Sequence, residues 1–145
     1  MKTAILLLVL FLWAFPGCAS DSYKITLPNG LRIDAELAKD KAKGLQGRMS
    51  LCHDCGMVFI FEREGYYPFW MKETLINLAM LWINSDGEIV HIVKNAEPCI
   101  PKKNSYPECE IFSPLSPAKY VLEINPEAAR DVEVGTKIKS NPPLF

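Results

Sequence analysis

Hydrophobic and polar residues alternate over two neighbouring stretches near the start of the chain. Tyr23–Leu27 and Leu31–Leu37 each place apolar side chains at every second position, and Pro28-Asn29-Gly30 separates the two stretches. Strict alternation is typical of half-buried β-strands, and Asn-Gly between two such runs is a strong signal for a hairpin turn. We therefore predict a β-hairpin over these residues.

A second hairpin is predicted further along the chain. Leu78–Ile83 and Glu88–Val93 flank a turn that contains Asp86 and Gly87, and Asp-Gly is another favoured turn sequence. Short apolar runs of strand length indicate the remaining strands. These are predicted at Met57–Phe61, at Tyr120–Ile124 and near Lys137–Lys139.

Two short helices complete the prediction. One covers Asp40–Met49, although Gly44 and Gly47 weaken it. The other begins after Asn125, which is suited to cap a helix whose first residue is Pro126. The sequence thus predicts a mainly β fold, a compact, sandwich-like antiparallel domain with two short helices. An α+β arrangement is the alternative.

The N-terminal stretch is a targeting signal rather than part of the fold. Lys2 precedes an uninterrupted apolar run from Ala4 to Phe15, which is typical of an export signal. A membrane-spanning helix needs about 20 apolar residues, so this run is too short for one. We predict a cleaved export signal at residues 1–20, a single β-rich domain at 21–139 and a C-terminal tail at 140–145.

Two cleavage sites compete. Gly17 and Cys18 resemble a bacterial lipobox, in which a peptidase cuts before a cysteine that carries lipid, although Phe15 stands where leucine is usual. Cleavage after Ala19 or Ser20 would instead release a free secreted protein. We favour lipidation of Cys18 and expect the protein in the bacterial cell envelope or periplasm, held to the membrane by its lipid.

Charge and composition restrict the function of the remaining chain. The 145 residues carry a formal net charge of −1, and removing the leader leaves 15 basic and 17 acidic residues. This balance argues against a nucleic-acid partner, because binding to a phosphate backbone needs a strong positive bias. The length fits one globular domain.

Four cysteines follow the leader, an even number suited to an oxidising compartment. Cys99 and Cys109 lie in a proline-rich loop at Lys94–Ala118, which their pairing would pin. Cys52 and Cys55 form a Cys-x-x-Cys motif. Four cysteines allow three pairings, of which Cys52–Cys55 with Cys99–Cys109 is the local one.

The Cys52-x-x-Cys55 motif has three interpretations: a structural disulfide, a thiol–disulfide exchange site and a zinc site. Zinc would need further ligands from His53, His91, Cys99 or Cys109. Thioredoxin-like exchange sites lie at the start of a helix, where the helix dipole helps to ionise the thiol. This motif instead follows a predicted helix and leads into a strand. We therefore favour the structural disulfide.

Several segments carry a family resemblance. The segment Phe69–Thr74 reads Phe-Trp-Met-Lys-Glu-Thr and follows the phenylalanine-containing strand Gly56–Phe61. Together with Gly44–Arg48 and Ala118–Glu123, in this order, it resembles the family called domain of unknown function 192 (DUF192, uncharacterised protein family UPF0127). The resemblance covers nearly the whole mature chain. It implies a compact, mainly β, sandwich-like domain with small helices and implies no activity.

This sequence departs from the family pattern at three positions. Members commonly carry asparagine, proline and aspartate where Glu73, Asn77 and Ala79 stand here. Any role that depends on the missing aspartate is in doubt in this chain, unless Glu73 supplies a carboxylate nearby.

The segment Phe69–Thr74 is the best candidate for ligand binding. In an extended strand Trp70 and Met71 point to opposite faces, so one belongs to the core and the other to the surface. Lys72 is suited to an anionic group, Thr74 can donate a hydrogen bond, and the family position of Arg48 places it nearby. The alternative is that Trp70 only packs and Lys72 is only solvated. The candidate binding residues are Phe69, Trp70, Met71, Lys72, Thr74 and Arg48.

No phosphate-binding loop, nucleophile elbow or His-Glu-x-x-His motif occurs in the sequence. We assign no catalytic residue, cofactor or metal. We predict an exported, lipid-anchored envelope protein that acts as a non-catalytic binding or accessory module for an unknown protein or small molecule. The alternatives are a thiol–disulfide or zinc-dependent enzyme that uses Cys52 and Cys55, and a soluble secreted protein that binds a small ligand.

Overall fold

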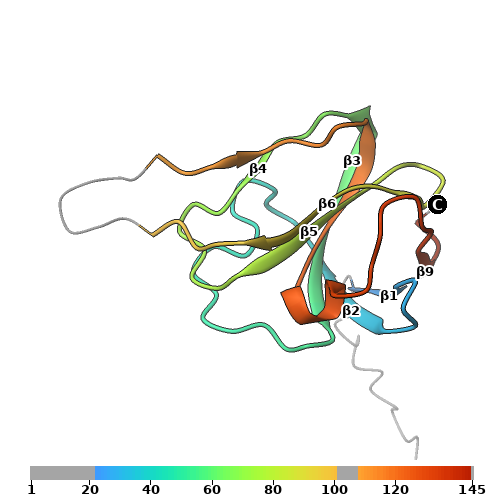
Figure 1. Cartoon of the computed structure of the whole chain (residues 1–145), viewed down its shortest axis with the longest axis horizontal. Helices are drawn as coiled ribbons and strands as arrows, with labels where there is room; N and C mark the ends of the chain where they lie inside the picture. Colours follow the sequence, from blue (N-terminus) through green and yellow to red (C-terminus); the bar gives the residue numbers. More distant parts are fainter. Residues whose placement is uncertain (1–21, 101–107, 145) are drawn as a thin grey trace, which may run out of the picture.

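A computed structural model describes residues 22–100 and 108–144. The predicted export signal at 1–20, with Cys18, lies outside these residues. Over the described ranges the chain forms β-strands and one short 3-10 helix, η1 (Figure 1). The elements are β1 (Ser22–Thr26), β2 (Arg32–Leu37), β3 (Cys55–Gly65), β4 (Phe69–Trp70), β5 (Leu78–Ile83), β6 (Ile89–Ala96), β7 (Ile111–Phe112), β8 (Ala118–Ile124), η1 (Pro126–Ala129) and β9 (Lys139–Asn141).

Seven strands form one sheet in the order β6-β5-β8-β3-β2-β1-β9, and β4 pairs with β7 in a small second sheet. The large sheet is mixed, because β2 and β3 run parallel, with Asp34 opposite Cys55. The prediction of an antiparallel domain is therefore wrong for this pair. Parallel neighbours need a crossover connection, which the segment 38–54 provides.

Both predicted hairpins are confirmed. β1 and β2 pair antiparallel with Ile25 opposite Ile33, and Gly30 in their turn has a φ of 88°. β5 and β6 also pair antiparallel, and the side chain of Asn84 accepts hydrogen bonds from two backbone N–H groups of their turn. Gly87 completes this turn with a φ of 77°, a left-handed conformation that glycine adopts without strain.

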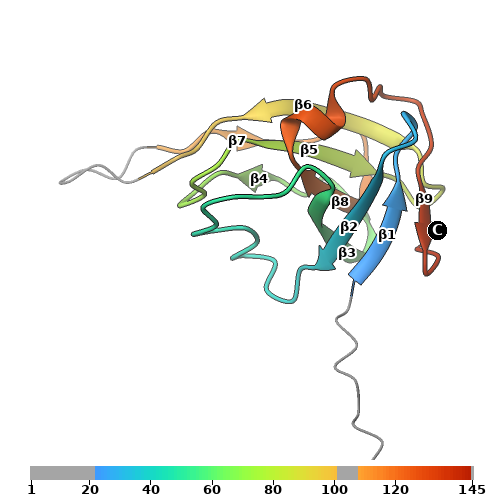
Figure 2. The same ribbon diagram turned by 90° about the horizontal axis from the view of Figure 1, so that it is seen from below.

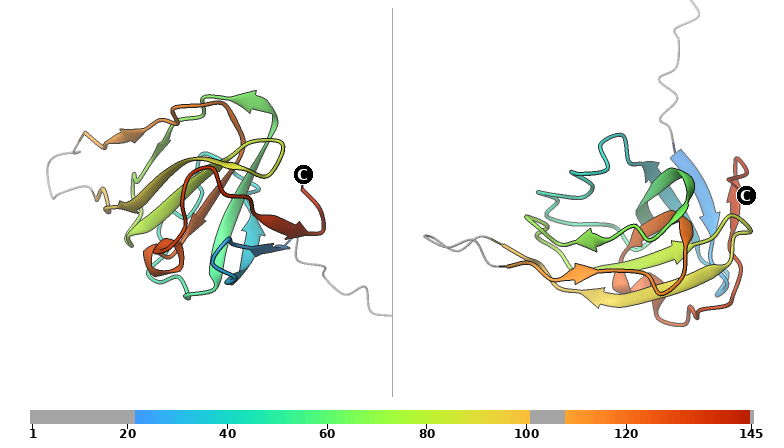
Figure 3. Two further views of the ribbon diagram at one scale, coloured as in Figure 1. Left: turned by 45° about the vertical axis from the view of Figure 1, so that its right-hand side comes forward. Right: turned by 90° about the horizontal axis from the view of Figure 1, so that it is seen from above.

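The large sheet buries both of its faces at its central strands. Along β8, Tyr120, Leu122 and Ile124 belong to one hydrophobic cluster, and Val121 belongs to the other. Figure 2 shows the sheet strongly curved, with β1, β2 and β9 turned across one end, and η1 contributes to the first cluster. Figure 3 shows β4 and the segment between β2 and β3 beside the sheet, and residues of both belong to or pack against the second cluster. This arrangement confirms the mainly β, sandwich-like fold.

The predicted helix at Asp40–Met49 is wrong. The segment instead forms consecutive turns, and the side chain of Asp40 accepts hydrogen bonds from the backbone N–H groups of Ala42 and Lys43. Gly44 and Gly47 have φ angles of 48° and 73°. An α-helix needs negative φ at every residue, so the two glycines end each turn before a helix can propagate.

The second predicted helix is confirmed as η1. The side chain of Asn125 accepts a hydrogen bond from the backbone N–H of Glu127, and Pro126 occupies the first turn. Across the described ranges no helix is long and apolar enough to cross a membrane.

The C-terminal residues join the sheet rather than forming a separate tail. β9 begins at Lys139, later than the strand predicted near Lys137–Lys139, and Ser140 pairs with Ile25 of β1. The prediction of a tail at 140–145 is therefore wrong at its first two residues. Leu144 packs against the first hydrophobic cluster, and its carbonyl accepts a hydrogen bond from the hydroxyl of Tyr120.

The proline-rich segment predicted as a loop at Lys94–Ala118 contains the end of β6, the whole of β7 and the first residue of β8. β6 continues to Ala96, and β7 pairs with β4 through Phe112 opposite Phe69. Within this segment the sulfur atoms of Cys99 and Cys109 are bonded at 2.03 Å. The segment is thus tied both to the small sheet and to itself.

Substitution of Gly56 in β3 tests how closely the central strands pack. A Cβ atom at this position would lie 2.8 Å from the backbone oxygen of Glu123 and 2.8 Å from Cγ2 of Ile124. Gly56→Ala is therefore expected to lower the free energy of unfolding by about 1–3 kcal/mol, measured by urea denaturation. Gly65→Ala in the same strand is the control, because the atoms nearest to its Cβ position belong to the side chain of Tyr67 rather than to the backbone of a neighbouring strand. Equal losses for the two variants would contradict this account of the packing.

Candidate functional site

In the predicted binding segment, the neighbouring residues Trp70 and Met71 point to the surface and to the core respectively, as expected for an extended strand. Met71 is 1% exposed, whereas Trp70 is 48% exposed. The ring of Phe69 lies edge-on to the rings of Phe59 and Trp82, with centroids 4.8 Å and 5.7 Å away. β4 is therefore anchored by Phe69 on one side of the strand and presents Trp70 on the other.

Lys72 and Thr74 extend this surface. The Nζ atom of Lys72 lies 5.3 Å from the centroid of the Trp70 ring, a cation–π contact. Thr74 is buried, and its backbone N–H donates to the carbonyl of Met71. Two backbone hydrogen bonds tie the same segment to Cys99: Glu73 N–H donates to its carbonyl, and its own N–H donates to the carbonyl of Met71.

The structure adds one residue that the sequence prediction missed. Glu123 of β8 lies between Met57 of β3 and Met80 of β5, and only 4% of it is exposed. Its Oε2 atom has no hydrogen-bond partner among the described residues. Burial raises the pKa of Glu123 to about 8, because an apolar environment disfavours the charged form. The carboxyl group is therefore mostly protonated at neutral pH.

A small cavity lies next to Glu123. Residues 41–46, which we call the roof segment, line it together with Phe59, Phe69, Trp70, Thr74 and Glu123. Its volume is about 30 Å³, enough for one water molecule. The cavity therefore joins the buried carboxyl to two of the predicted binding residues, Trp70 and Thr74, and to the anchoring residue Phe69.

Gly44 sets the depth of the roof segment. A Cβ atom at Gly44 would lie 3.1 Å from the ring of Phe59 and 3.7 Å from Oε2 of Glu123. The absence of a side chain thus lets the backbone approach the carboxyl closely. A backbone hydrogen bond from Gly47 N–H to the carbonyl of Glu73, 2.9 Å long, fastens the next residues of this loop to the Trp70 segment.

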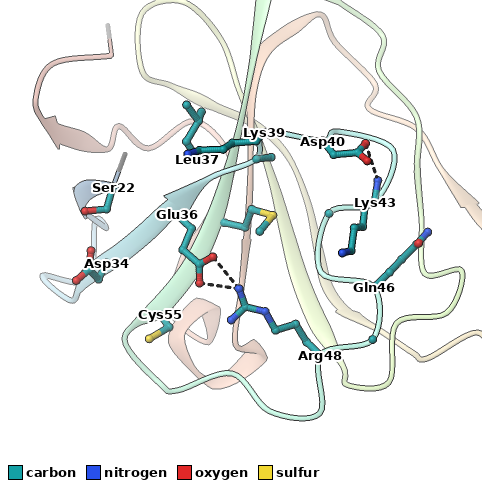
Figure 4. Close-up of a pocket in the computed structure, with 14 residues that line it drawn as sticks. Ser22, Asp34, Glu36, Leu37, Lys39, Asp40, Lys43, Gln46, Arg48 and Cys55 are labelled. Atoms are coloured by element: carbon teal, nitrogen blue, oxygen red, sulfur yellow. Dashed lines mark hydrogen bonds and ion pairs between the residues drawn. The ribbon is translucent and has the colours of Figure 1, made fainter. Parts of the chain in front are cut away.

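Arg48 lies in a separate cleft. Figure 4 shows its guanidinium pointing at the carboxylate of Glu36 on β2, and Nη2 lies 2.7 Å from both carboxylate oxygens. The cleft has a volume of about 850 Å³ and is also lined by Asp34, Asp40 and Lys43. Because the pair is partly exposed, it contributes little stability. The structure therefore does not bring the Arg48 side chain into the cavity with Trp70.

Met71 also faces away from the Glu123 cavity. It lines a different small pocket with Cys99, Glu97 and Glu110. The six predicted binding residues are thus distributed over three places, and only Phe69, Trp70 and Thr74 meet at one cavity.

The cysteines adopt the local pairing. Cys52 and Cys55 are bonded in a turn in which Cys55 N–H donates to the carbonyl of Cys52, and β3 follows directly. Metal-ligand atoms of three or more residues gather, within the described ranges, only at Cys52, Asp54 and Cys55. The structure does not bring His91 to this group; its ring lies 5.2 Å from that of Trp82, and burial lowers its pKa.

Sequence reasoning overlooked Glu123 although a signal was present. It is the single charged side chain in the otherwise apolar end of the strand Tyr120–Ile124. On a strand with two buried faces, the side chain of a glutamate does not reach bulk water. Its carboxyl is therefore expected either to pair with another side chain or to lie beside a cavity. Nothing in the sequence, however, indicates that the roof segment covers it.

Comparison with known proteins identifies the family. The model of DUF192, described as "Uncharacterized ACR", matches residues 25–140. The chain therefore belongs to the DUF192 family, which confirms the resemblance seen in the sequence. No curated protein matches the chain.

Two solved structures share this fold. A protein of Sinorhizobium meliloti 1021, described provisionally as a transcription regulator, is 31% identical, with a TM-score of 0.69 over 83% of this chain and 92% of its own. A protein of unknown function from Novosphingobium aromaticivorans DSM 12444 is 29% identical, with a TM-score of 0.69 over 81% of this chain and 83% of its own.

The buried carboxyl makes stability depend on pH. An unfolded glutamate titrates near a pKa of about 4.3, whereas Glu123 titrates at about 8 in the folded state. Between these values the folded state binds a proton that the unfolded state lacks, so stability falls as pH rises toward 8. The slope reaches about 1.4 kcal/mol per pH unit and is absent outside this window.

Glu123→Gln is expected to remove this part of the pH dependence, measured by urea denaturation across the same pH window. The control is Glu62→Gln, because Glu62 is an exposed carboxylate of β3. An unchanged pH profile in Glu123→Gln would contradict the assignment of the buried proton to Glu123.

Proposed function

We propose that this DUF192 protein is exported, anchored to the bacterial envelope by lipid on Cys18, and acts as a non-catalytic binding module. The leader with its lipobox-like Gly17-Cys18 supports export and anchoring. The two cysteine pairs support an oxidising compartment, because disulfides persist outside the cytoplasm. Two acyl chains hold a protein stably on a membrane, where one is marginal.

One observation carries the binding role: Glu123, whose Oε2 atom has no hydrogen-bond partner among the described residues, lines a cavity together with the half-exposed Trp70. A buried polar atom without a partner costs free energy. A ligand that enters the cavity with a hydrogen-bond donor would remove that cost. An aromatic wall with one convergent polar group is also the usual composition of a small-molecule site.

The same cavity supports binding better than catalysis. The polar residues that line it are Lys41, Lys43, Gln46, Thr74 and Glu123. Acid–base work normally requires a second group to exchange the proton, such as a histidine or another carboxylate. Neither occurs among the residues that line this cavity.

A regulatory role on nucleic acid, which the description of the Sinorhizobium meliloti protein brings to mind, is not proposed for this chain. The mature residues carry slightly more acidic than basic side chains, whereas nucleic-acid binding depends on a positive surface.

Cys18→Ser tests the anchor. The wild-type protein is expected to incorporate radiolabelled palmitate and to sediment with membranes, and Cys18→Ser is expected to lose both properties. Ser20→Ala is the control, because it changes a neighbouring residue and keeps the cysteine. A mature wild-type protein that begins at Ala19, Ser20 or Asp21, found free in the medium, would contradict the anchor.

Thiol titration tests the enzyme alternative at Cys52 and Cys55. The mature protein is expected to show no reactive thiol before reduction, because all four cysteines of the domain are paired. It is also expected to leave the disulfides of insulin intact in the presence of glutathione. Catalysed reduction of insulin that is lost in Cys52→Ser and retained in Cys99→Ser would instead establish a redox enzyme.

A further inference from the structure

The cavity beside Glu123 restricts what can enter it. At about 30 Å³ it accepts a single small group, such as a water molecule, a hydroxyl or an ammonium head. Oε2 of Glu123 lies 3.7 Å from the position that a Cβ atom at Gly44 would occupy, so the carboxyl is close to the roof segment. The entering group is therefore expected to form a hydrogen bond with this carboxyl, whose Oε2 atom has no partner within the described ranges.

We propose that the cavity receives a hydroxyl group of a sugar or related polyol, which forms a hydrogen bond with the carboxyl of Glu123 while the ligand packs on the exposed side chain of Trp70. This inference rests on the proposed binding function and names the chemistry of its ligand.

Charge favours a hydroxyl over an ammonium group. Lys41 and Lys43 of the roof segment line the cavity, and Lys72 lies over the ring of Trp70. The other elements around the cavity contribute no further charge, because they supply Phe59, Phe69, Trp70 and Thr74. A cationic ligand on the Trp70 ring would therefore meet the ammonium group of Lys72. Repulsion between these like charges disfavours it.

The protonation of Glu123 points to the same chemistry. Because burial raises its pKa to about 8, the group is mostly a neutral carboxylic acid at pH 7. A neutral carboxylic acid both donates and accepts hydrogen bonds, as a hydroxyl does. An ammonium group only donates, and it would have to displace the proton before forming an ion pair.

Trp70 supplies the surface for the rest of the ligand. About half of its side chain is exposed although it lines the cavity wall. An indole offers a flat apolar face that can cover the C–H face of a pyranose ring, and such burial contributes in proportion to the apolar area removed from water. Lys72 beside the ring can donate hydrogen bonds to neighbouring ligand oxygens.

The test compares two probes, methyl α-glucoside and ethylammonium chloride, titrated into the processed wild-type protein. Binding is followed by the NMR signal of the Trp70 indole N–H, assigned with Trp70→Phe. The glucoside is expected to bind with an affinity that does not rise between about pH 6 and pH 8. An ammonium ligand that needs the carboxylate would gain up to about tenfold per pH unit over this range.

Two substitutions of Glu123 separate the ligand classes. Glu123→Gln keeps an acceptor and a donor, so glucoside affinity is expected to stay within about threefold of the wild type. Glu123→Met removes both and is expected to weaken binding about tenfold or more. Glu123→Met fills the site with an apolar side chain. A thermal unfolding measurement of this variant checks that the fold is retained.

A matched pair of aromatic substitutions tests whether the ligand packs on Trp70. Trp70→Ala is expected to lower glucoside affinity about tenfold or more. Tyr66→Ala is the control, because Tyr66 is 63% exposed and does not line the cavity. For this pair binding is measured by isothermal titration, since the indole signal of Trp70 is lost.

Each failure has a distinct meaning. Binding of ethylammonium, lost in Glu123→Gln, with no glucoside binding would overturn the hydroxyl class and leave the binding function intact. Glucoside binding that survives in Glu123→Met would move the site elsewhere and overturn the inference. If neither probe binds, the hydroxyl ligand and this inference are overturned, whereas the anchor at Cys18 is tested separately.

Discussion

β8 is the strand on which the rest of this structure depends. It pairs with β3 on one side and with β5 on the other, and hydrophobic clusters cover both of its faces. A side chain on such a strand cannot reach bulk water whichever face it points to. Glu123 therefore remains inside the protein. Burying its ionisable carboxyl at the centre of the sheet costs free energy. The neighbouring methionines supply an apolar wall and no hydrogen bond.

The loop that covers this carboxyl depends on backbone geometry more than on side-chain contacts. Gly44 and Gly47 both adopt positive φ, which keeps the segment in separate turns and lets the chain at Gly44 press against Phe59. Leu45, between them, is buried in the second hydrophobic cluster. One apolar anchor thus holds the loop down, and its flanking glycines shape it over the cavity.

The sequence was sufficient where a feature is determined locally. The hairpins follow from Asn-Gly and Asp-Gly turns, and the cap at Asn125 follows from its side chain and from the proline after it. It was insufficient where distant segments meet. The parallel pairing of β2 with β3 is set by the route of the segment 38–54, which no local pattern encodes. Residues 40–49 have a helical pattern, but tertiary packing and two glycines override it.

At the candidate site, too, the locally determined features were predicted and those that depend on distant segments were not. Alternation correctly separated Trp70 from Met71, because it is a property of the strand itself. Proximity of Arg48 to Trp70 was inferred from its position in the family pattern, yet the side chain turns toward Glu36. The cavity beside Glu123 was not predicted, because it exists only where β4, β8 and the roof segment come together in three dimensions.

The disulfide Cys99–Cys109 determines when the segment that carries Trp70 becomes restrained. Cys99 accepts from Glu73 and donates to Met71 through its backbone, on the two sides of Lys72. The covalent bond therefore limits the motion of the segment that carries Trp70. A newly made chain with reduced thiols lacks this restraint. Oxidation would then restrain the segment that carries Trp70 only in molecules that have reached an oxidising environment.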